Sequence, residues 1–205
     1  IGACIGTIKL NQVNCGSGIV PGNHIVGLAS SGIHSNGLTL ARKVLLGETL
    51  QQQKIKVNEY SKTLGTTLGL ELLTPTKIYV QELLQMMEEG INVKAMTHIT
   101  GGGFCNLNRV FSDNIRFVLN DLPEPLPIFQ LIQETGEVSI AEMHQVFNMG
   151  VGMCIIVENA DDANRAKAIS QKYGTQAQSI GYVEACNRKE VVIPKYNLTG
   201  CDSSF

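Results

Sequence analysis

The residues best suited to hold a ligand lie in a small polar stretch at positions 30–37, Ser-Ser-Gly-Ile-His-Ser-Asn-Gly. The stretch follows an apolar run at 25–29 and precedes an amphipathic segment, a pattern typical of a strand, a loop and a helix. Small residues let a backbone approach a ligand closely, and the unpaired N–H groups at a helix start can bind an anion. We expect Ser35 or Asn36 to cap the following helix through its side chain.

Two more loops resemble the first in composition, at positions 98–103 after a predicted strand and at 148–152 after a predicted helix. For a single loop of this kind, a capped turn without any ligand is the alternative. Several such loops suggest one shared site. The residues predicted to bind a substrate or a phosphate group are Ser30, Ser31, Gly32, Ser35, Asn36, Gly37, Thr100, Gly101, Gly102, Gly103, Asn148, Gly150 and Gly152.

Histidine is the side chain best able to exchange or share a proton near neutral pH, and two of the four histidines lie in these loops. We predict that His34 is catalytic, as a loop residue outside the core that donates to a phosphate or a substrate oxygen. The alternative is a turn residue without a role in chemistry. His98 lies at the end of a predicted strand. For this residue, the alternative to a role in chemistry is a hydrogen bond that holds the Gly-rich loop.

Other catalytic and metal motifs are missing from the sequence. It contains no G-x-x-x-x-G-K-[ST], no complete G-x-G-x-x-G, no H-E-x-x-H and no G-x-S-x-G. The cysteines lack C-x-x-C pairs and histidines at metal spacing, so we predict no metal site and mostly reduced thiols in the core. The cysteines are Cys4, Cys15, Cys105, Cys154, Cys186 and Cys201.

Composition bounds the class of protein. The 205 residues are 43% apolar, enough for a sizeable core, and we expect a single domain over 1–205. A formal net charge of −2 and 17% charged residues do not favour binding to nucleic acid or an acidic membrane. No apolar run is long enough to span a membrane, so we expect a soluble, cytoplasmic protein. The absence of Met at position 1 suggests a fragment of a longer chain.

Hydrophobic periodicity and turn residues predict intermingled strands and helices. Predicted strands cover 3–10, 25–29, 92–99, 115–119, 153–157, 179–185 and 190–193, and predicted helices cover 37–46, 74–89, 104–111, 126–135, 139–147 and 160–173. Residues 51–67 are polar without a clear period and are expected to form a surface insertion. This order favours an α/β fold in which a mixed β-sheet is layered with helices.

Four segments, 27–37, 75–80, 98–103 and 147–153, together resemble the phosphoribosylformylglycinamidine cyclo-ligase family, also called aminoimidazole ribonucleotide synthetase. They occur in the order and approximate spacing seen in that family. The resemblance covers nearly the whole chain but only the C-terminal half of the enzyme. The family's N-terminal domain, with its acidic segment and most of the ATP and metal contacts, has no counterpart in these 205 residues.

The resemblance implies an enzyme of purine biosynthesis that uses ATP and Mg²⁺. In that family, ATP phosphorylates the formyl oxygen of formylglycinamidine ribonucleotide, a nitrogen attacks the same carbon, and loss of phosphate closes the imidazole ring. The implied fold is a three-layer α/β/α domain packed on an N-terminal domain that makes a homodimer. The loops beginning at Ser30, Thr100 and Asn148 would face the cleft between the domains, and the chain alone is expected to be inactive.

Two alternatives remain open at this point. One is a non-catalytic binding module that has kept the fold. The other is a different ATP-dependent enzyme with the same two-domain plan, such as selenophosphate synthetase, thiamine monophosphate kinase or a hydrogenase maturation factor. The segments 30–37 and 147–153 favour the cyclo-ligase over these relatives.

Overall fold

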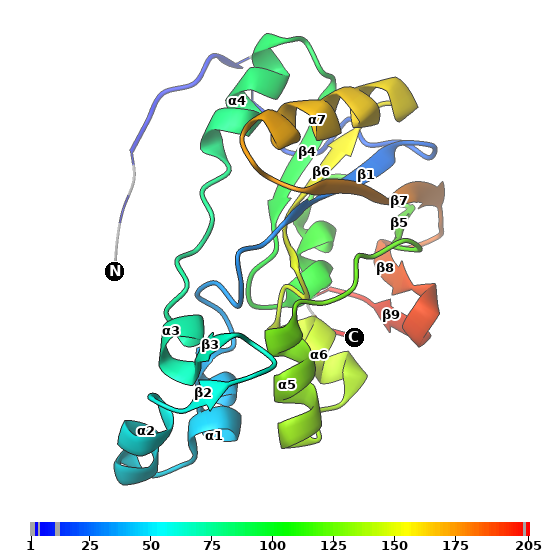
Figure 1. Ribbon diagram of the computed structural model, residues 1–205. Helices are drawn as coiled ribbons and strands as arrows, with labels where there is room; N and C mark the ends of the chain where they lie inside the picture. Colours follow the sequence, from blue (N-terminus) through cyan, green and yellow to red (C-terminus); the bar gives the residue numbers. More distant parts are fainter. Residues whose placement is uncertain (1–2, 4, 11–12, 203) are drawn as a thin grey trace.

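Strands and helices alternate along the computed structural model, which describes residues 3, 5–10, 13–202 and 204–205 (Figure 1). The strands are β1 (His24–Ala29), β2 (Tyr60–Ser61), β3 (Thr66–Thr67), β4 (Val93–His98), β5 (Ile115–Val118), β6 (Val151–Val157), β7 (Ala177–Ala185), β8 (Glu190–Ile193) and β9 (Leu198–Gly200). The helices are α1 (Leu38–Leu46), α2 (Leu50–Lys56), α3 (Leu68–Leu72), α4 (Val80–Glu88), α5 (Pro127–Gly136), α6 (Ile140–Val146) and α7 (Ala160–Lys172), with 3₁₀ helices η2 (Gly103–Arg109) and η3 (Pro194–Tyr196).

A seven-stranded sheet in the order β4-β6-β1-β7-β5-β8-β9 forms the centre of the fold. Its neighbouring strands are antiparallel except for the parallel pair β5 and β8. The sheet is therefore mixed, which confirms the predicted α/β class.

Helices cover both faces of this sheet, because successive strand residues point to opposite sides. On β1, Ile25 belongs to one hydrophobic core, whereas Val26 and Leu28 belong to the other. Helices α4 and α7 cover the Val26 face (Figure 1). The opposite face is covered by η2, and α1, α5 and α6 pack together at one end of the sheet.

Local capping explains where several helices begin. Thr49 and Gln52 form a complete capping box at α2, and Ser139 Oγ accepts a hydrogen bond from the backbone N–H of Glu142 at α6, as predicted. The side chain of Asn159 caps α7 in the same way. These bonds satisfy N–H groups that the first helical turn leaves unpaired.

Three predicted elements differ from the structure. The strand predicted over 3–10 is wrong: residue 4 lies outside the described residues, and the others form no strand and are exposed, with Ile5 97% exposed. The helix predicted from residue 74 begins at Val80, because residues 74–79 form no regular secondary structure and bond to the first loop instead. The predicted helix at 104–111 is the 3₁₀ helix η2, which ends at Arg109.

Other differences add more structure than the predicted surface insertion, for which a helical turn was the most that the sequence suggested. The insertion at 51–67 contains most of α2 and the small β2–β3 sheet, and α3 follows it directly. Leu68 of α3 is buried in the main core, so this region packs on the fold. Strand β9 was also missed; its three residues are too few to show a period.

The five described cysteines carry free thiols, but only Cys105 and Cys154 are buried, so the prediction that most lie in the core is only partly met. Cys4 lies outside the described residues. None of the helices in the described part of the chain is long and apolar enough to cross a membrane.

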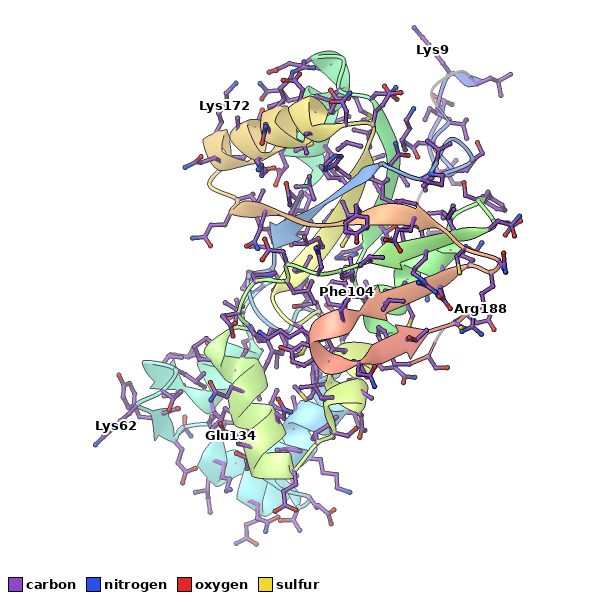
Figure 2. The ribbon with its side chains drawn as sticks, turned by 90° about the vertical axis from the view of Figure 1, so that its right-hand side faces the viewer. Lys9, Lys62, Phe104, Glu134, Lys172 and Arg188 are labelled. Carbon is purple, nitrogen blue, oxygen red and sulfur yellow. The ribbon has the colours of Figure 1, made fainter. Side chains whose placement is uncertain are left out.

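Phe104 provides a test of how firmly η2 holds the sheet. Its side chain is fully buried and lies near the centre of the molecule in Figure 2. We expect Phe104→Ala to lower the free energy of unfolding by about 3–5 kcal/mol, because the lost ring leaves a cavity. Phe111 is 76% exposed, and Phe111→Ala should change stability by no more than about 0.5 kcal/mol. Urea denaturation of both variants measures the two changes in the free energy of unfolding. Equal changes would contradict the assignment of Phe104 to the core and Phe111 to the surface.

Candidate functional site

The three predicted loops meet at one end of the sheet because of the order β4-β6-β1. Strands β1 and β4 end there, at Ala29 and His98, and the antiparallel strand between them begins there, at Val151. Backbone hydrogen bonds join the loops: the N–H of Ser30 donates to Gly150 at 2.9 Å, and the N–H of Ile99 donates to Gly152 at 2.9 Å. The structure therefore places the sequence-predicted loops side by side.

The side chain of Asn148 connects the first loop to the third. It is fully buried, and its Oδ1 accepts hydrogen bonds from Ser30 Oγ and from the backbone N–H of Gly150, each at 2.9 Å. Its Nδ2 donates to the carbonyls of Gly32 at 2.9 Å and Ile33 at 3.2 Å. All four bonding positions of the carboxamide are used, so Asn148 positions the loops, and a ligand contact through this side chain would have to displace one of these bonds.

The first loop is held from outside by the segment 74–79, which joins α3 to α4. Ser31 Oγ donates to the carbonyl of Pro75 at 2.6 Å, and Ser35 Oγ lies 3.2 Å from Thr76 Oγ1. Both serines are exposed. They are therefore accessible to solvent although their hydroxyls already have protein partners.

The predicted cap of α1 is wrong. The residue at the cap position is Gly37, with φ of 68°, and neither Ser35 nor Asn36 makes a side-chain capping bond. A Cβ at Gly37 would collide with the ring of Phe147, so only glycine fits both the left-handed backbone and the space. The Nδ2 group of Asn36 is instead buried without a hydrogen-bond partner among the described residues.

His34 differs most from its expected environment. It was expected to lie outside the core, but it is a loop residue that is only 4% exposed. Its backbone has φ of 62°, which is uncommon for a residue other than glycine. Its Nε2 accepts hydrogen bonds from the backbone N–H of Ser31 at 3.1 Å and, more weakly, from that of Lys77 at 3.5 Å. These contacts hold the His34 ring between the first loop and the segment 74–79.

The protonation state of His34 follows from these contacts. Burial, with a smaller contribution from repulsion by His98, lowers the pKa of His34 to about 4, so the ring is neutral at pH 7. Since Nε2 accepts hydrogen bonds, the single ring proton lies on Nδ1. Nδ1 is buried and has no partner among the described residues. It is therefore a neutral donor without an acceptor.

The rings of His98 and Tyr79 lie near the ring of His34. Their centroids lie 6.2 Å away for His98 and 6.5 Å away for Tyr79. The Tyr79 hydroxyl donates to the carbonyl of Ala29 at 2.9 Å, and burial is the main cause that raises its pKa. The structure thus adds Tyr79 to the site; the sequence offered no signal for it beyond its place in segment 75–80.

Gly152 explains how closely these rings approach the sheet. It lies in β6 and not in the predicted loop, and a Cβ there would collide with the Tyr79 hydroxyl and come within 2.6 Å of His34 Cε1. A side chain at this position would displace both rings.

The second loop folds back against α6. The N–H of Gly102 donates to the carbonyl of Gln145 at 3.0 Å, and a Cβ at Gly103 would collide with the carbonyl of His144. Asn106, which sequence reasoning missed, donates to Thr100 Oγ1 at 3.3 Å. Gly101 is exposed and has open space where a Cβ would be, so its backbone is accessible to a ligand.

The chemistry available at this site is hydrogen-bond donation by neutral groups. His34 Nδ1 and Asn36 Nδ2 are buried donors without acceptors, and a ligand oxygen would satisfy them at no cost in buried charge. Because His34 is neutral, it suits stabilisation of an oxygen better than transfer of its proton at pH 7. The described residues contain no cluster of three or more His, Cys, Asp or Glu side chains that could hold a metal ion.

Comparison with known proteins relates the whole chain to other sequences. A family model described as AIR synthase related protein, C-terminal domain, matches residues 20–194. The phosphoribosylformylglycinamidine cyclo-ligase of Methanococcus maripaludis (strain C7) is 44% identical over 202 residues, covering 96% of this chain and 56% of that protein. The protein of the same name from Brevibacillus brevis is 41% identical over 192 residues, covering 93% of this chain and 54% of that protein.

The fold is also shared with a solved structure. E. coli HypE, a hydrogenase maturation protein, matches with a TM-score of 0.55 at 19% identity, covering 95% of this chain and 53% of that protein. At this identity the match shows a common fold and carries no information on function. The chain spans about half the length of the curated relatives it matches.

The role of Asn148 can be tested by an isosteric change. In Asn148→Asp, a carboxyl oxygen would face the carbonyls of Gly32 and Ile33 and both donated bonds would weaken or vanish. We expect a loss of about 2–4 kcal/mol in the free energy of unfolding. Asn58 is exposed, and Asn58→Asp should change stability by less than about 0.5 kcal/mol. If Asn148→Asp melts at the wild-type temperature, the four-bond connection is not needed for the fold.

The lowered pKa of His34 predicts a pH dependence. The unfolded chain takes up a proton near pH 6.5 and the folded chain near pH 4, so folding stability is lost as the pH falls through this window. Between pH 7 and pH 5, wild type should lose about 1–2 kcal/mol more than His34→Gln, which keeps an acceptor for Ser31 but cannot ionise. Denaturation at both pH values measures this; parallel losses in the two proteins would show that His34 is not buried in its neutral form.

Proposed function

Because the chain belongs to the AIR synthase related protein, C-terminal domain family, we propose that it is the C-terminal domain of a phosphoribosylformylglycinamidine cyclo-ligase. The observation that carries this proposal is the 44% identity, across 96% of the chain, to a protein of that name. The structural match to HypE at 19% identity concerns the fold alone and does not favour the alternative enzymes. The part of the relatives beyond this chain would complete the enzyme.

The proposed reaction joins ATP and formylglycinamidine ribonucleotide. The formyl oxygen attacks the terminal phosphorus of ATP and ADP leaves; the nitrogen then attacks the formyl carbon, and phosphate departs with that oxygen as the imidazole ring closes. Charge develops on oxygen atoms in both steps, and fixed donors that meet this charge accelerate such reactions. The unpaired donors His34 Nδ1 and Asn36 Nδ2 support a role of this kind for the first loop.

In this proposal, the two halves of the enzyme have different roles in binding ATP and its metal ion. Phosphoryl transfer from ATP depends on a metal ion held by carboxylates, and the described residues offer no such cluster. We therefore assign no step of the reaction to a metal held by this chain. The proposal places Mg²⁺ and most contacts to ATP on the preceding domain, with the three loops of this chain facing it.

An apolar stripe supports the presence of that second domain. Val80, Leu84 and Met87 share one face of α4 and are 56%, 49% and 43% exposed. Ile78, which lies two residues before α4, is 78% exposed. Clustered apolar side chains of this kind are typical of a surface that another domain covers. A homodimer made through that domain and a cytoplasmic location belong to the same proposal.

A chimaeric enzyme tests the proposal. The chain alone should show no ATP-dependent formation of aminoimidazole ribonucleotide. Joined to the preceding part of the M. maripaludis relative, it should gain this activity. In the chimaera, His34→Gln should lower turnover about tenfold or more, because it removes the Nδ1 donor while keeping the acceptor for Ser31.

His24 provides the matched control for this experiment. It lies half-buried at the opposite end of β1, so His24→Gln in the chimaera should leave turnover within about twofold of the unmodified chimaera. Melting temperatures separate activity from folding. Turnover by the isolated chain, or an unchanged rate in a folded His34→Gln chimaera, would contradict the proposal in its present form.

A further inference from the structure

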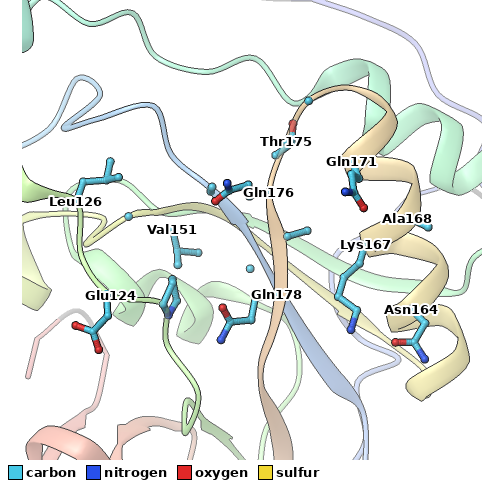
Figure 3. Close-up of a pocket in the computed structure, with 16 residues that line it drawn as sticks. Glu124, Leu126, Val151, Asn164, Lys167, Ala168, Gln171, Thr175, Gln176 and Gln178 are labelled. Carbon is cyan, nitrogen blue, oxygen red and sulfur yellow. The ribbon is translucent and has the colours of Figure 1, made fainter.

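A cavity of about 730 Å³ lies beside β7, away from the ring cluster of His34, His98 and Tyr79. Helix α7 forms one wall and the segment 123–126 forms the opposite wall (Figure 3). Gly27 and Ala29 of β1 and Gly150 also line the cavity, and Gly150 accepts a hydrogen bond from Ser30 of the first loop. None of the loop chemistry described above uses the side chains of this cavity.

The α7 wall carries one cation, Lys167, whose side chain extends into the cavity (Figure 3). Among the described residues, its ammonium group makes no salt bridge and no hydrogen bond. The single acidic residue among the described lining residues, Glu124, already pairs with Lys195 at 3.0 Å. The cavity therefore presents an uncompensated positive charge, which suits a phosphate or a carboxylate.

Four amide side chains also line the cavity. Asn164 and Gln171 line the cavity from α7, and Gln176 and Gln178 line it from β7. Gln178 Nε2 donates to the carbonyl of Asp121 at 2.8 Å, which leaves its Oε1 available as an acceptor. Each amide carries both a donor and an acceptor, the pattern that matches the edge of a heteroaromatic base.

Apolar side chains complete the opposite wall. Leu126 and Val151 lie across the cavity from Lys167 in Figure 3 and offer a surface on which a planar ring can rest. We infer that this cavity binds a mononucleotide-sized metabolite, with its phosphate at Lys167 and its base toward the amides, Leu126 and Val151. This site is distinct from the proposed cyclo-ligase site, because its lining residues lie outside the three loops except for Gly150 and Val151, neither of which offers a polar side chain.

Calorimetric titration of the 205-residue chain tests the inference with adenosine monophosphate as the probe. We expect saturable 1:1 binding with a dissociation constant below about 1 mM. Lys167→Gln should weaken binding about tenfold by removing the anion partner. Ala168 lies exposed on the same wall, and Ala168→Phe should block binding by filling the cavity without disturbing the core.

Two control variants and a second probe make the result decisive. Lys172 is on the same helix but outside the cavity, 3.8 Å from Glu89, so Lys172→Gln should bind as wild type does. His34→Gln should also leave the affinity unchanged; a loss there would place the nucleotide in the loop site and overturn the inference. Absence of saturable binding, or wild-type affinity in both Lys167→Gln and Ala168→Phe, would overturn it as well. Inorganic phosphate that binds as tightly as adenosine monophosphate would rule out recognition of the base.

Discussion

Four hydrogen bonds converge on the buried carboxamide of Asn148 and tie the start of β6 to the loop that follows β1. No other side chain of similar shape offers two donors and two acceptor sites, and the buried carbonyls of Gly32 and Ile33 would otherwise lack these partners. Buried polar bonds of this kind are strong because water does not compete with them. The conformation of the first loop, and with it the position of His34, depends on this connection.

That conformation leaves two donors, His34 Nδ1 and Asn36 Nδ2, buried without acceptors. Each costs about 1–3 kcal/mol relative to a satisfied group. In the proposed function, a ligand oxygen placed between the loops would supply the missing acceptors and offset this cost. The neutral state of His34 fits this role, since a buried cation would be far more costly than a neutral donor.

The main strands and helices were predictable because their signals are local. Periodicity located α1, α5 and α7 to within about two residues, and Ser139 marked the start of α6. The errors arose where distant contacts override local preference. Pro75 suggests a helix start, but residues 74–79 form no helix, and Ser31, Ser35 and His34 bond to this segment.

The amino-acid pattern alone was enough to locate three small polar loops, to match them to a known family pattern, and to indicate that the fold mixes strands with helices. Only the tertiary structure decided what each loop residue does. Asn148 bonds to Ser30, 118 positions away, and His34 bonds to Lys77, 43 positions away. No local pattern could therefore show that every hydrogen-bonding position of Asn148 is occupied or that His34 is buried. The cap at Gly37 was likewise decided by the ring of Phe147, and the cavity beside β7 by the meeting of α7 with the segment 123–126. Burial and hydrogen-bond partnership are properties of the packed chain, because they depend on which distant groups exclude water from each residue.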